Sequence, residues 1–347
     1  MTEHSGSRSS DLQPEGQIPG AEGLARLAGR HVTMVDADRV REEPNWDEVR
    51  HRLDDGRFFW LDIHEPSPED VETLEGLLDL HPLVVEDLLA FGQRPKGEGY
   101  GDHALVVAYG ASSDDDGLVE VHSIVGATWL VTLHRDDCLA FPRLFHRMAA
   151  GQGRRPAVAG GALYRVLDAL TDSFFEPLEA LNDRVDELQS EIIDAPERGS
   201  MQEVMAAKQQ LINVRRVVAP QRDLLAQLAA GTIELPGVDD AKRRYYRDVY
   251  DHMIRLADMV DTLRDLLTGV LEVYLAMVAN RRDQVMKQLT LIATIFMPLT
   301  FITGFFGQNF GWMVGHVGSW TAFALATVFQ LATVAGALMV FKRRGWL

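Results

Sequence analysis

The sequence predicts an α+β membrane protein, in which an α/β domain precedes a long helix that continues into the first of two C-terminal membrane helices. Three observations predict this class. No Asp, Glu, Lys or Arg occurs from Gln288 to Phe341, although charged residues make up 24% of the chain. Polar residues at Gly307 to Asn309 divide that segment into two pieces, each long enough to cross a bilayer. Before it, short runs rich in Val, Ile and Phe give way to long helical patterns.

Composition limits the partners of the soluble part. A formal net charge of -17 argues against a nucleic-acid partner, which calls for a basic face. The acidity serves solubility or, alternatively, attracts cations. The single cysteine, Cys138, excludes an intrachain disulfide and fits a reducing compartment. Residues 1–30 are rich in Ser, Gly and Glu without an apolar run, so we expect a disordered tail and no signal peptide.

Residues 31–155 are expected to form a small α/β domain. Runs rich in Val, Ile, Phe and Trp, bounded by Gly, Asp or Pro, predict five strands: Val32–Asp36, Phe58–Ile63, Ala104–Ala108, Val119–Val125 and Thr128–Leu133. Ser67 to Asp70, followed by apolar residues at helical spacing, predicts a helix start, and Gly117 after three aspartates predicts a turn. The strand order stays open.

The next part of the chain is predicted to be helical throughout. Residues 160–237 are expected to form an antiparallel helical pair, Leu163–Ile193 and Ser200–Ala230, because apolar residues recur every three or four positions in both. Between Asp239 and Pro298 there is no other proline and a single glycine, Gly269. That pattern predicts a stalk helix at 239–306 that runs into the first membrane span.

The two spans are expected at Leu289–Phe306 and 319–341, joined by an uncharged outer loop at 307–318. Basic residues flank both spans: Arg281, Arg282 and Lys287 before the first, and Lys342, Arg343 and Arg344 after the second. The positive-inside rule then places both termini, including the basic tail 342–347, in the cytoplasm. Two core helices of a soluble protein are a poor alternative, because soluble helices rarely run this far without a charge on a solvent face.

A line of residues spaced by seven follows one face of the stalk helix: Asp251, Asp258, Asp265, Glu272, Ala279, Met286, Ala293 and Thr300. A helix drifts by only about 20° per heptad, so the four carboxylates share one face. That face is either solvated or lines a cation path. Within the first span, the face predicts pore and gate positions at Met286, Leu289, Ala293, Met297 and Thr300. Lipid contact or helix packing is the alternative, and a closed path requires several copies of the chain.

The polar break between the spans offers oxygen ligands. A ring of Asn309 amides would suit a hydrated hard cation such as Mg²⁺, which gives up its waters reluctantly, and Gly307 permits close backbone approach. A plain helix end and turn is the alternative. An enzyme is not indicated: His64-Glu65 lacks the second His of a zincin helix, and the chain has no phosphate loop or dinucleotide fingerprint. The twelve-residue spacing of His122, His134 and His146 does not suggest a metal site.

The run VMKQLTLIATIFMPLTFITGFFGQNF, from Val285 to Phe310, resembles the CorA-type divalent metal ion transporters, whose first span ends in Tyr-Gly-Met-Asn. The segments His81–Asp87 and Gln93–Lys96 and the basic ending Lys342–Leu347 also look like that family. The resemblance covers residues 31–347. It implies a funnel-shaped homopentamer with a cytoplasmic α/β domain and two membrane helices in the cytoplasmic (inner) membrane. It also implies Mg²⁺ as the transported ion and as a regulator, with no organic cofactor.

The resemblance carries roles to particular positions. Gly307, Gln308 and Asn309 match the ion-selecting signature, and Met286, Leu289 and Met297 match the hydrophobic gate. Thr300 matches a polar ring of the pore and Glu272 an acidic position at its entrance. Asp87 and Asp248, with Glu86 beside the first, match a regulatory Mg²⁺ site between subunits. Lys342, Arg343 and Arg344 match a basic collar near the gate.

Two departures from the family pattern bear on the ion. Gln308 replaces the signature Met, as happens in the ZntB-type zinc-transporting branch, and the outer loop carries no carboxylate. Three functions are therefore considered. The first is Mg²⁺ influx, with Co²⁺ or Ni²⁺ as further ions, gated by cytoplasmic Mg²⁺. The second is a zinc transporter of the same architecture, and the third is a membrane-anchored metal sensor that conducts no ion.

Overall fold

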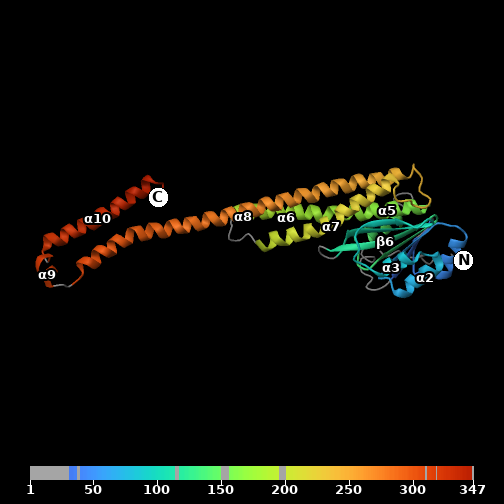
Figure 1. Ribbon diagram of the computed structural model, residues 1–347, viewed down its shortest axis with the longest axis horizontal. Helices are drawn as coiled ribbons and strands as arrows, with labels where there is room; N and C mark the ends of the chain where they lie inside the picture. The colour runs from blue at the N-terminus through green and yellow to red at the C-terminus, as the bar shows by residue number, and fades with distance from the viewer. Residues whose placement is uncertain are drawn as a thin grey trace, which may run out of the picture. The chain divides into compact units, whose positions relative to one another are not determined.

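The computed structural model describes residues 31–36, 40–113, 117–149, 156–194, 201–308, 311–317 and 319–345. The expected tail at 1–30 and the predicted signature residue Asn309 lie outside the described residues. The chain divides into two compact units, one of Met1–Glu187 with Gln202–Leu267 and one of Leu188–Met201 with Thr268–Leu347 (Figure 1).

The first unit contains a seven-stranded sheet in the order β2-β1-β3-β7-β6-β5-β4. The strands are β1 His31–Val35, β2 Val40–Glu42, β3 Phe59–His64, β4 Lys96–Gly99, β5 His103–Ala111, β6 Leu118–Gly126 and β7 Trp129–His134. The pairing of β3 with β7 is parallel, and the other neighbours are antiparallel. All five strands expected from apolar runs are present. The two that were not expected, β2 and β4, are short and polar, and they lie at the two edges.

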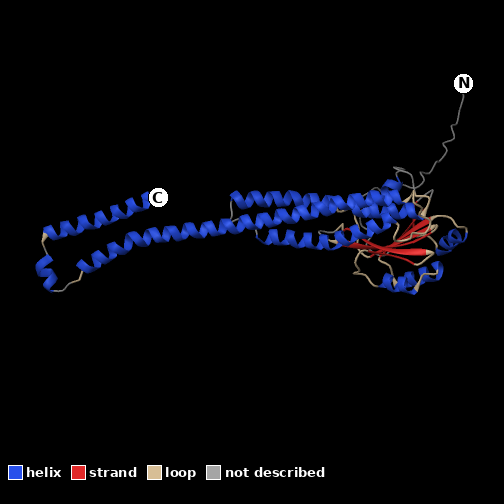
Figure 2. Cartoon of the chain, turned by 45° about the horizontal axis from the view of Figure 1, so that its top comes forward, coloured by secondary structure: helices blue, strands red, loops and turns tan. Residues whose placement is uncertain are grey.

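Helices cover both faces of this sheet (Figure 2). The shorter ones are α1 Trp46–Asp54, α2 Pro68–Leu78, α3 Pro82–Leu89 and α4 Ala140–Ala149. The helix start predicted at Ser67 is present as a capping box, in which the Ser67 hydroxyl accepts from the Asp70 amide and the Asp70 carboxylate accepts from the Ser67 amide. Trp60 of β3 lies 5.2 Å from the Phe145 ring of α4, centroid to centroid.

Three helices follow, where the sequence pattern predicted two: α5 Ala159–Asp172, α6 Phe175–Asp194 and α7 Met201–Ala230. The single helix expected over Leu163–Ile193 breaks at Ser173. The buried Ser173 hydroxyl donates to the Leu170 carbonyl at 2.6 Å and accepts from the Ala111 amide at 2.8 Å. The end of α5 is thereby fixed to the end of β5, a contact that periodicity along the chain does not reveal.

The expected stalk helix is α8, Arg243–Phe306, which is 64 residues long and contains Pro298. In its first half, the buried residues alternate at spacings of three and four: Tyr246, Val249, Met253, Leu256, Val260, Leu263, Leu267 and Val270. This is the core pattern of a coiled coil. After Val270 the large apolar side chains of α8 are mostly exposed, as at Met286, Leu289 and Phe296.

The second unit contains the rest of α8, the short helix α9 Gly311–Val317 and α10 Trp320–Arg343. Both α8 and α10 contain a window long and apolar enough to span a membrane, and almost none of either window is buried. Exposed apolar surface on this scale requires lipid or neighbouring chains. The N-terminus of α10 is capped by Ser319, whose hydroxyl accepts from the Ala322 amide at 3.3 Å.

Candidate ion pathway and metal centre

The face of α8 opposite its buried core is acidic. The four carboxylates predicted from the heptad spacing are all exposed: Asp251, Asp258, Asp265 and Glu272. When Tyr246 and Val249 are taken as core positions of the heptad, these carboxylates occupy the position farthest from the core. The stripe is therefore not part of the coiled-coil packing of its own helix. It is placed to face water.

The same face continues into the apolar part of α8. All five predicted pore and gate residues are exposed within the single chain: Met286, Leu289, Ala293, Met297 and Thr300. Met297 is the most open of the apolar ones, at 74% exposure. The Thr300 hydroxyl donates to the Phe296 carbonyl at 2.8 Å, so its oxygen lone pairs remain available as acceptors. One chain does not enclose a path, and the pore assignment stays a prediction.

The end of α8 depends on Gly307. Its amide donates to the Thr303 carbonyl at 2.9 Å, and a Cβ at this position would lie only 2.9 Å from the same oxygen. Any larger residue would have to move the backbone, so the glycine has a steric reason to be there. Gln308 follows and is exposed. The third predicted signature residue, Asn309, is outside the described part of the chain.

The predicted basic collar lies beside the start of the first span. Lys342 and Arg343 end α10, Arg344 caps it, and the Lys287 ammonium of α8 donates to the Gly345 carbonyl at 3.4 Å. Lys287 is adjacent in sequence to the predicted gate residue Met286. The second span thus returns to the level at which the first one begins, so both ends of this helical hairpin lie on one side.

The predicted regulatory residues Glu86 and Asp87 lie on α3. Glu86 is exposed, whereas the Asp87 carboxylate accepts from the Lys96 ammonium of β4 at 2.6 Å. Lys96 also lies 3.1 Å from Glu98, whose second oxygen accepts from the Tyr100 hydroxyl at 2.6 Å. The bond from Tyr100 is the main reason why the pKa of Glu98 is lowered. Asp87 is therefore already paired with a cation inside its own chain.

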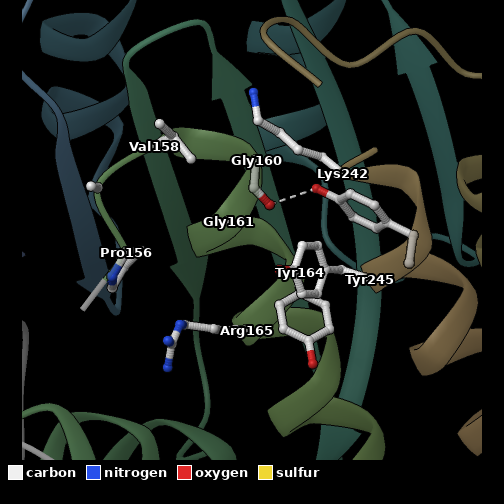
Figure 3. A pocket seen from close by; sticks show the side chains of 10 residues that line it. Pro156, Val158, Gly160, Gly161, Tyr164, Arg165, Lys242 and Tyr245 are labelled. Atoms are coloured by element: carbon white, nitrogen blue, oxygen red, sulfur yellow. Dashed lines mark hydrogen bonds between the residues drawn. The ribbon is translucent and has the colours of Figure 1, made fainter. Parts of the chain in front are cut away.

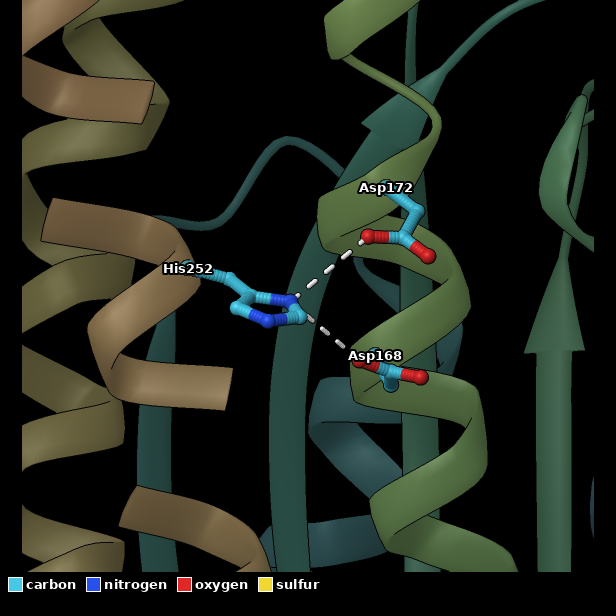
Figure 4. A group of neighbouring side chains, drawn as sticks. All are labelled: Asp168, Asp172 and His252. Carbon is cyan, nitrogen blue, oxygen red and sulfur yellow. Dashed lines mark ion pairs between the residues drawn. The ribbon is translucent and has the colours of Figure 1, made fainter. Parts of the chain in front are cut away.

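The other predicted regulatory residue, Asp248, lies on α8 near a separate acidic group. Its carboxylate is 3.5 Å from the Tyr164 hydroxyl of α5. One turn further along both helices, the His252 Nδ1 atom lies 3.6 Å from Asp168 and 3.7 Å from Asp172 (Figure 4). Among the residues that the structure describes, no hydrogen bond or ion pair joins Asp87 to Asp248.

The group of Asp168, Asp172 and His252 has the chemistry of a divalent metal site. One ligand atom from each residue lies within 4.8 Å of the other two. Burial and the neighbouring Asp172 carboxylate raise the pKa of Asp168 to about 6. Two carboxylates held this close repel one another, and a bound divalent cation would relieve the repulsion. Sequence analysis missed these residues, although Asp168 with Asp172 and Asp248 with His252 each share a helix face at a spacing of four.

A cavity of about 430 Å³ lies between the first turns of α5 and α8 (Figure 3), and its lining includes Tyr164, one helical turn before Asp168. The rings of Tyr164 and Tyr245 form part of its wall, with centroids 5.2 Å apart. The buried Tyr246 hydroxyl donates to the Gly160 carbonyl at 2.7 Å and joins the two helix starts. Tyr164 thus belongs both to the cavity wall and to the surroundings of Asp248.

Three features of the chain define a class of protein. They are an α/β domain, a helix whose acidic outer face leads into a membrane span, and a second span that returns to the start of the first. They are the parts of a two-span membrane transporter for cations. The chain belongs to the CorA-like Mg²⁺ transporter family, whose model matches residues 55–343.

Individual relatives support this membership. The chain is 34% identical over 296 residues to the cobalt/magnesium transport protein CorA of Thermotoga maritima, and the match covers 83% of each. The structure of the CorA magnesium transporter from Methanocaldococcus jannaschii superimposes with a TM-score of 0.79 at 22% identity, and covers 93% of this chain and all of that one. The ZntB cytoplasmic domain from Vibrio parahaemolyticus superimposes at 0.56 and 15% identity, over 74% of this chain and 99% of that one.

Family membership confirms the resemblance predicted from Val285–Phe310. The predicted architecture of an α/β domain, a stalk helix and two C-terminal apolar helices is confirmed by the same fold in the Methanocaldococcus jannaschii protein. The chain is therefore a divalent metal ion transporter of the cytoplasmic membrane and not an enzyme. The individual site residues remain predictions.

Proposed function

We propose that the chain forms a homopentameric channel that admits Mg²⁺ to the cytoplasm, with Co²⁺ and Ni²⁺ as further permeant ions. The observation that carries this proposal is the exposed face of α8. It presents carboxylates from Asp251 to Glu272 and then apolar and small residues from Met286 to Thr300, all outside the core of its own chain. Five such faces around an axis would close a water-filled path that one chain cannot enclose.

In this pore, each group of residues has a separate role. The ring of Asn309 amides at the outer mouth, which directly follows Gly307 and Gln308 in each chain, binds the hydrated ion. Met286, Leu289, Ala293 and Met297 form an apolar constriction that excludes water when closed, and Thr300 supplies a ring of hydroxyl oxygens. At the cytoplasmic end, Glu272 attracts cations. The collar of Lys342, Arg343 and Arg344 repels them unless it moves away.

Regulation is proposed to occur at Asp87, Glu86 and Asp248, which come together between neighbouring subunits and bind cytoplasmic Mg²⁺. The group of Asp168, Asp172 and His252 extends the site on the side of Asp248. When cytoplasmic Mg²⁺ is high, the bound ions neutralise these carboxylates and hold the subunits in the closed arrangement. When it is low, repulsion between the carboxylates favours opening.

Complementation tests the conducting site. A bacterial strain without its own Mg²⁺ uptake should grow at low Mg²⁺ when it expresses this chain, and should fail to do so with Asn309→Ala at equal membrane abundance. The expected loss is roughly 100-fold or more in uptake, since the site would lose a ring of amide ligands. Equal rescue by both chains would refute the assignment of Asn309.

A zinc transporter of the same architecture is the second candidate, favoured by Gln308 in place of the family's Met and by the likeness to the ZntB domain. Purified protein in liposomes, supplied separately with Mg²⁺, Co²⁺ and Zn²⁺, distinguishes the two. We expect Mg²⁺ flux. Zinc flux without Mg²⁺ flux would overturn the first candidate in favour of the second. Absence of any flux, together with Mg²⁺-dependent conformational change, would identify a sensor that conducts nothing.

A further inference from the structure

We propose that Lys96 is a built-in competitor for the regulatory ion at Asp87, so that its ammonium sets how much cytoplasmic Mg²⁺ is needed to close the channel. The inference rests on the proposed regulatory role of Asp87. It concerns a residue of β4 to which sequence analysis assigned no role beyond the resemblance of its segment.

The geometry of the group is that of an occupied cation site. The Lys96 ammonium lies 2.6 Å from Asp87 and 3.1 Å from Glu98, and the Tyr100 hydroxyl donates to the far oxygen of Glu98 at 2.6 Å. The Asp87 side chain is 22% exposed and that of Lys96 is 30% exposed. The pair is thus shielded more than an ordinary surface ion pair, yet an ion can still reach it from solvent.

The backbone holds these groups together independently of their charges. Lys96 pairs with Val107 across the sheet, and residues 96 and 98 point to the same face because side chains alternate along a strand. Gly97 between them packs closely, since a Cβ there would lie 2.7 Å from the end of the Ile233 side chain and 2.8 Å from that of Leu224, and both would have to shift. On the other side, the Gln93 amide donates to the Asp87 and Ala90 carbonyls and ties the end of α3 to the approach to β4.

A divalent cation that uses the Asp87 carboxylate must therefore displace an ammonium already in place. Glu98 offers the displaced ammonium a second partner. Because the ammonium already lies 3.1 Å from Glu98, a small rotation away from Asp87 leaves it paired with Glu98. The two residues then act in opposite directions on ion affinity. Lys96 weakens binding by competition, whereas Glu98 favours binding because it accepts the displaced ammonium.

The test measures the Mg²⁺ concentration that protects the full-length protein in detergent from chymotrypsin, with thermal unfolding as a second readout. Lys96→Met should lower the Mg²⁺ midpoint about three- to tenfold, the range expected for loss of a partly shielded ion pair. Glu98→Gln should raise it by a similar factor. In the Lys96→Met background, Glu98→Gln should change the midpoint much less, because no ammonium remains to be moved.

Two further variants separate the possible failures. Lys208→Met removes the same charge from α7, where the lysine pairs with no carboxylate among the described residues, and it should leave the midpoint unchanged. Asp87→Asn should abolish protection at the Mg²⁺ concentrations that protect the parent protein. An unchanged or raised midpoint in Lys96→Met, with protection lost in Asp87→Asn, overturns the competition alone. Full protection of Asp87→Asn overturns the regulatory role of Asp87 and the inference with it.

Discussion

At the scale of single residues, the structure explains several side chains by what surrounds them. Gly307 is small because the Thr303 carbonyl oxygen lies only 2.9 Å from the position that a Cβ would take. Asp87 is paired with Lys96, and partial burial and the neighbouring Asp172 carboxylate raise the pKa of Asp168 to about 6. Thr303 and Asp172 each lie four residues from their neighbour along a helix, whereas Lys96 belongs to a different element from Asp87. Gly307 was predicted from the polar break between the spans as well as from the family resemblance, Asp87 was predicted through the resemblance alone, and Asp168 was missed.

A substitution at Gly307 tests the steric argument. Gly307→Ala should reduce Mg²⁺ flux in liposomes roughly tenfold, because about 1.4 kcal/mol of strain at the helix end would displace the pore mouth. The matched control is Gly304→Ala, one turn earlier in α8, where a Cβ would meet nothing within 4 Å apart from the backbone of its own helix. Equal flux from both variants and the parent would show that the close approach at Gly307 does not position the mouth.

At the scale of elements, α8 joins two patterns on one helix. Its core positions pack as a coiled coil as far as Val270, and its opposite face carries the acidic residues toward the membrane. The heptad spacing predicted that acidic face because all of its carboxylate residues lie within one helix. The edge strands β2 and β4 and the break at Ser173 were not predictable in this way. The strands are polar, and the break depends on a bond to the Ala111 amide of another element.

The two faces of α8 should respond differently to substitution. Leu256 is fully buried, so Leu256→Ala should destabilise the protein by about 2–5 kcal/mol through lost burial and the cavity left behind. Asp258, two residues later, is exposed on the acidic face, and Asp258→Asn should change stability by less than about 0.5 kcal/mol. Thermal unfolding in detergent measures both. A large loss for Asp258→Asn would place that residue in a packed contact instead of on an aqueous face.

At the scale of the whole molecule, the unburied surface requires explanation. The spans in α8 and α10 leave large apolar side chains exposed, such as Phe301, Trp320 and Leu325. The carboxylates on the acidic face of α8 cannot be exposed to lipid without a large energetic cost. Lipid satisfies the first group and water satisfies the second along the stalk. Other copies of the chain are needed to keep this face away from lipid where it approaches the membrane. The exposed surfaces of one chain therefore indicate that the protein functions as an oligomer.

The number of copies can be counted directly. When chains with and without a mass tag are expressed together, a ring of five gives six species that differ in the number of tagged chains, whereas a tetramer gives five and a hexamer seven. Native mass spectrometry in detergent should therefore resolve six peaks, the lightest with the mass of five 38.7 kDa chains. The same experiment with Asp248→Asn controls for assembly, since a ring held together by its membrane helices should keep six species without that carboxylate. A different number of peaks in the parent protein would exclude the pentameric pore, and with it the proposed rings of Asn309 and Thr300 in their five-fold form.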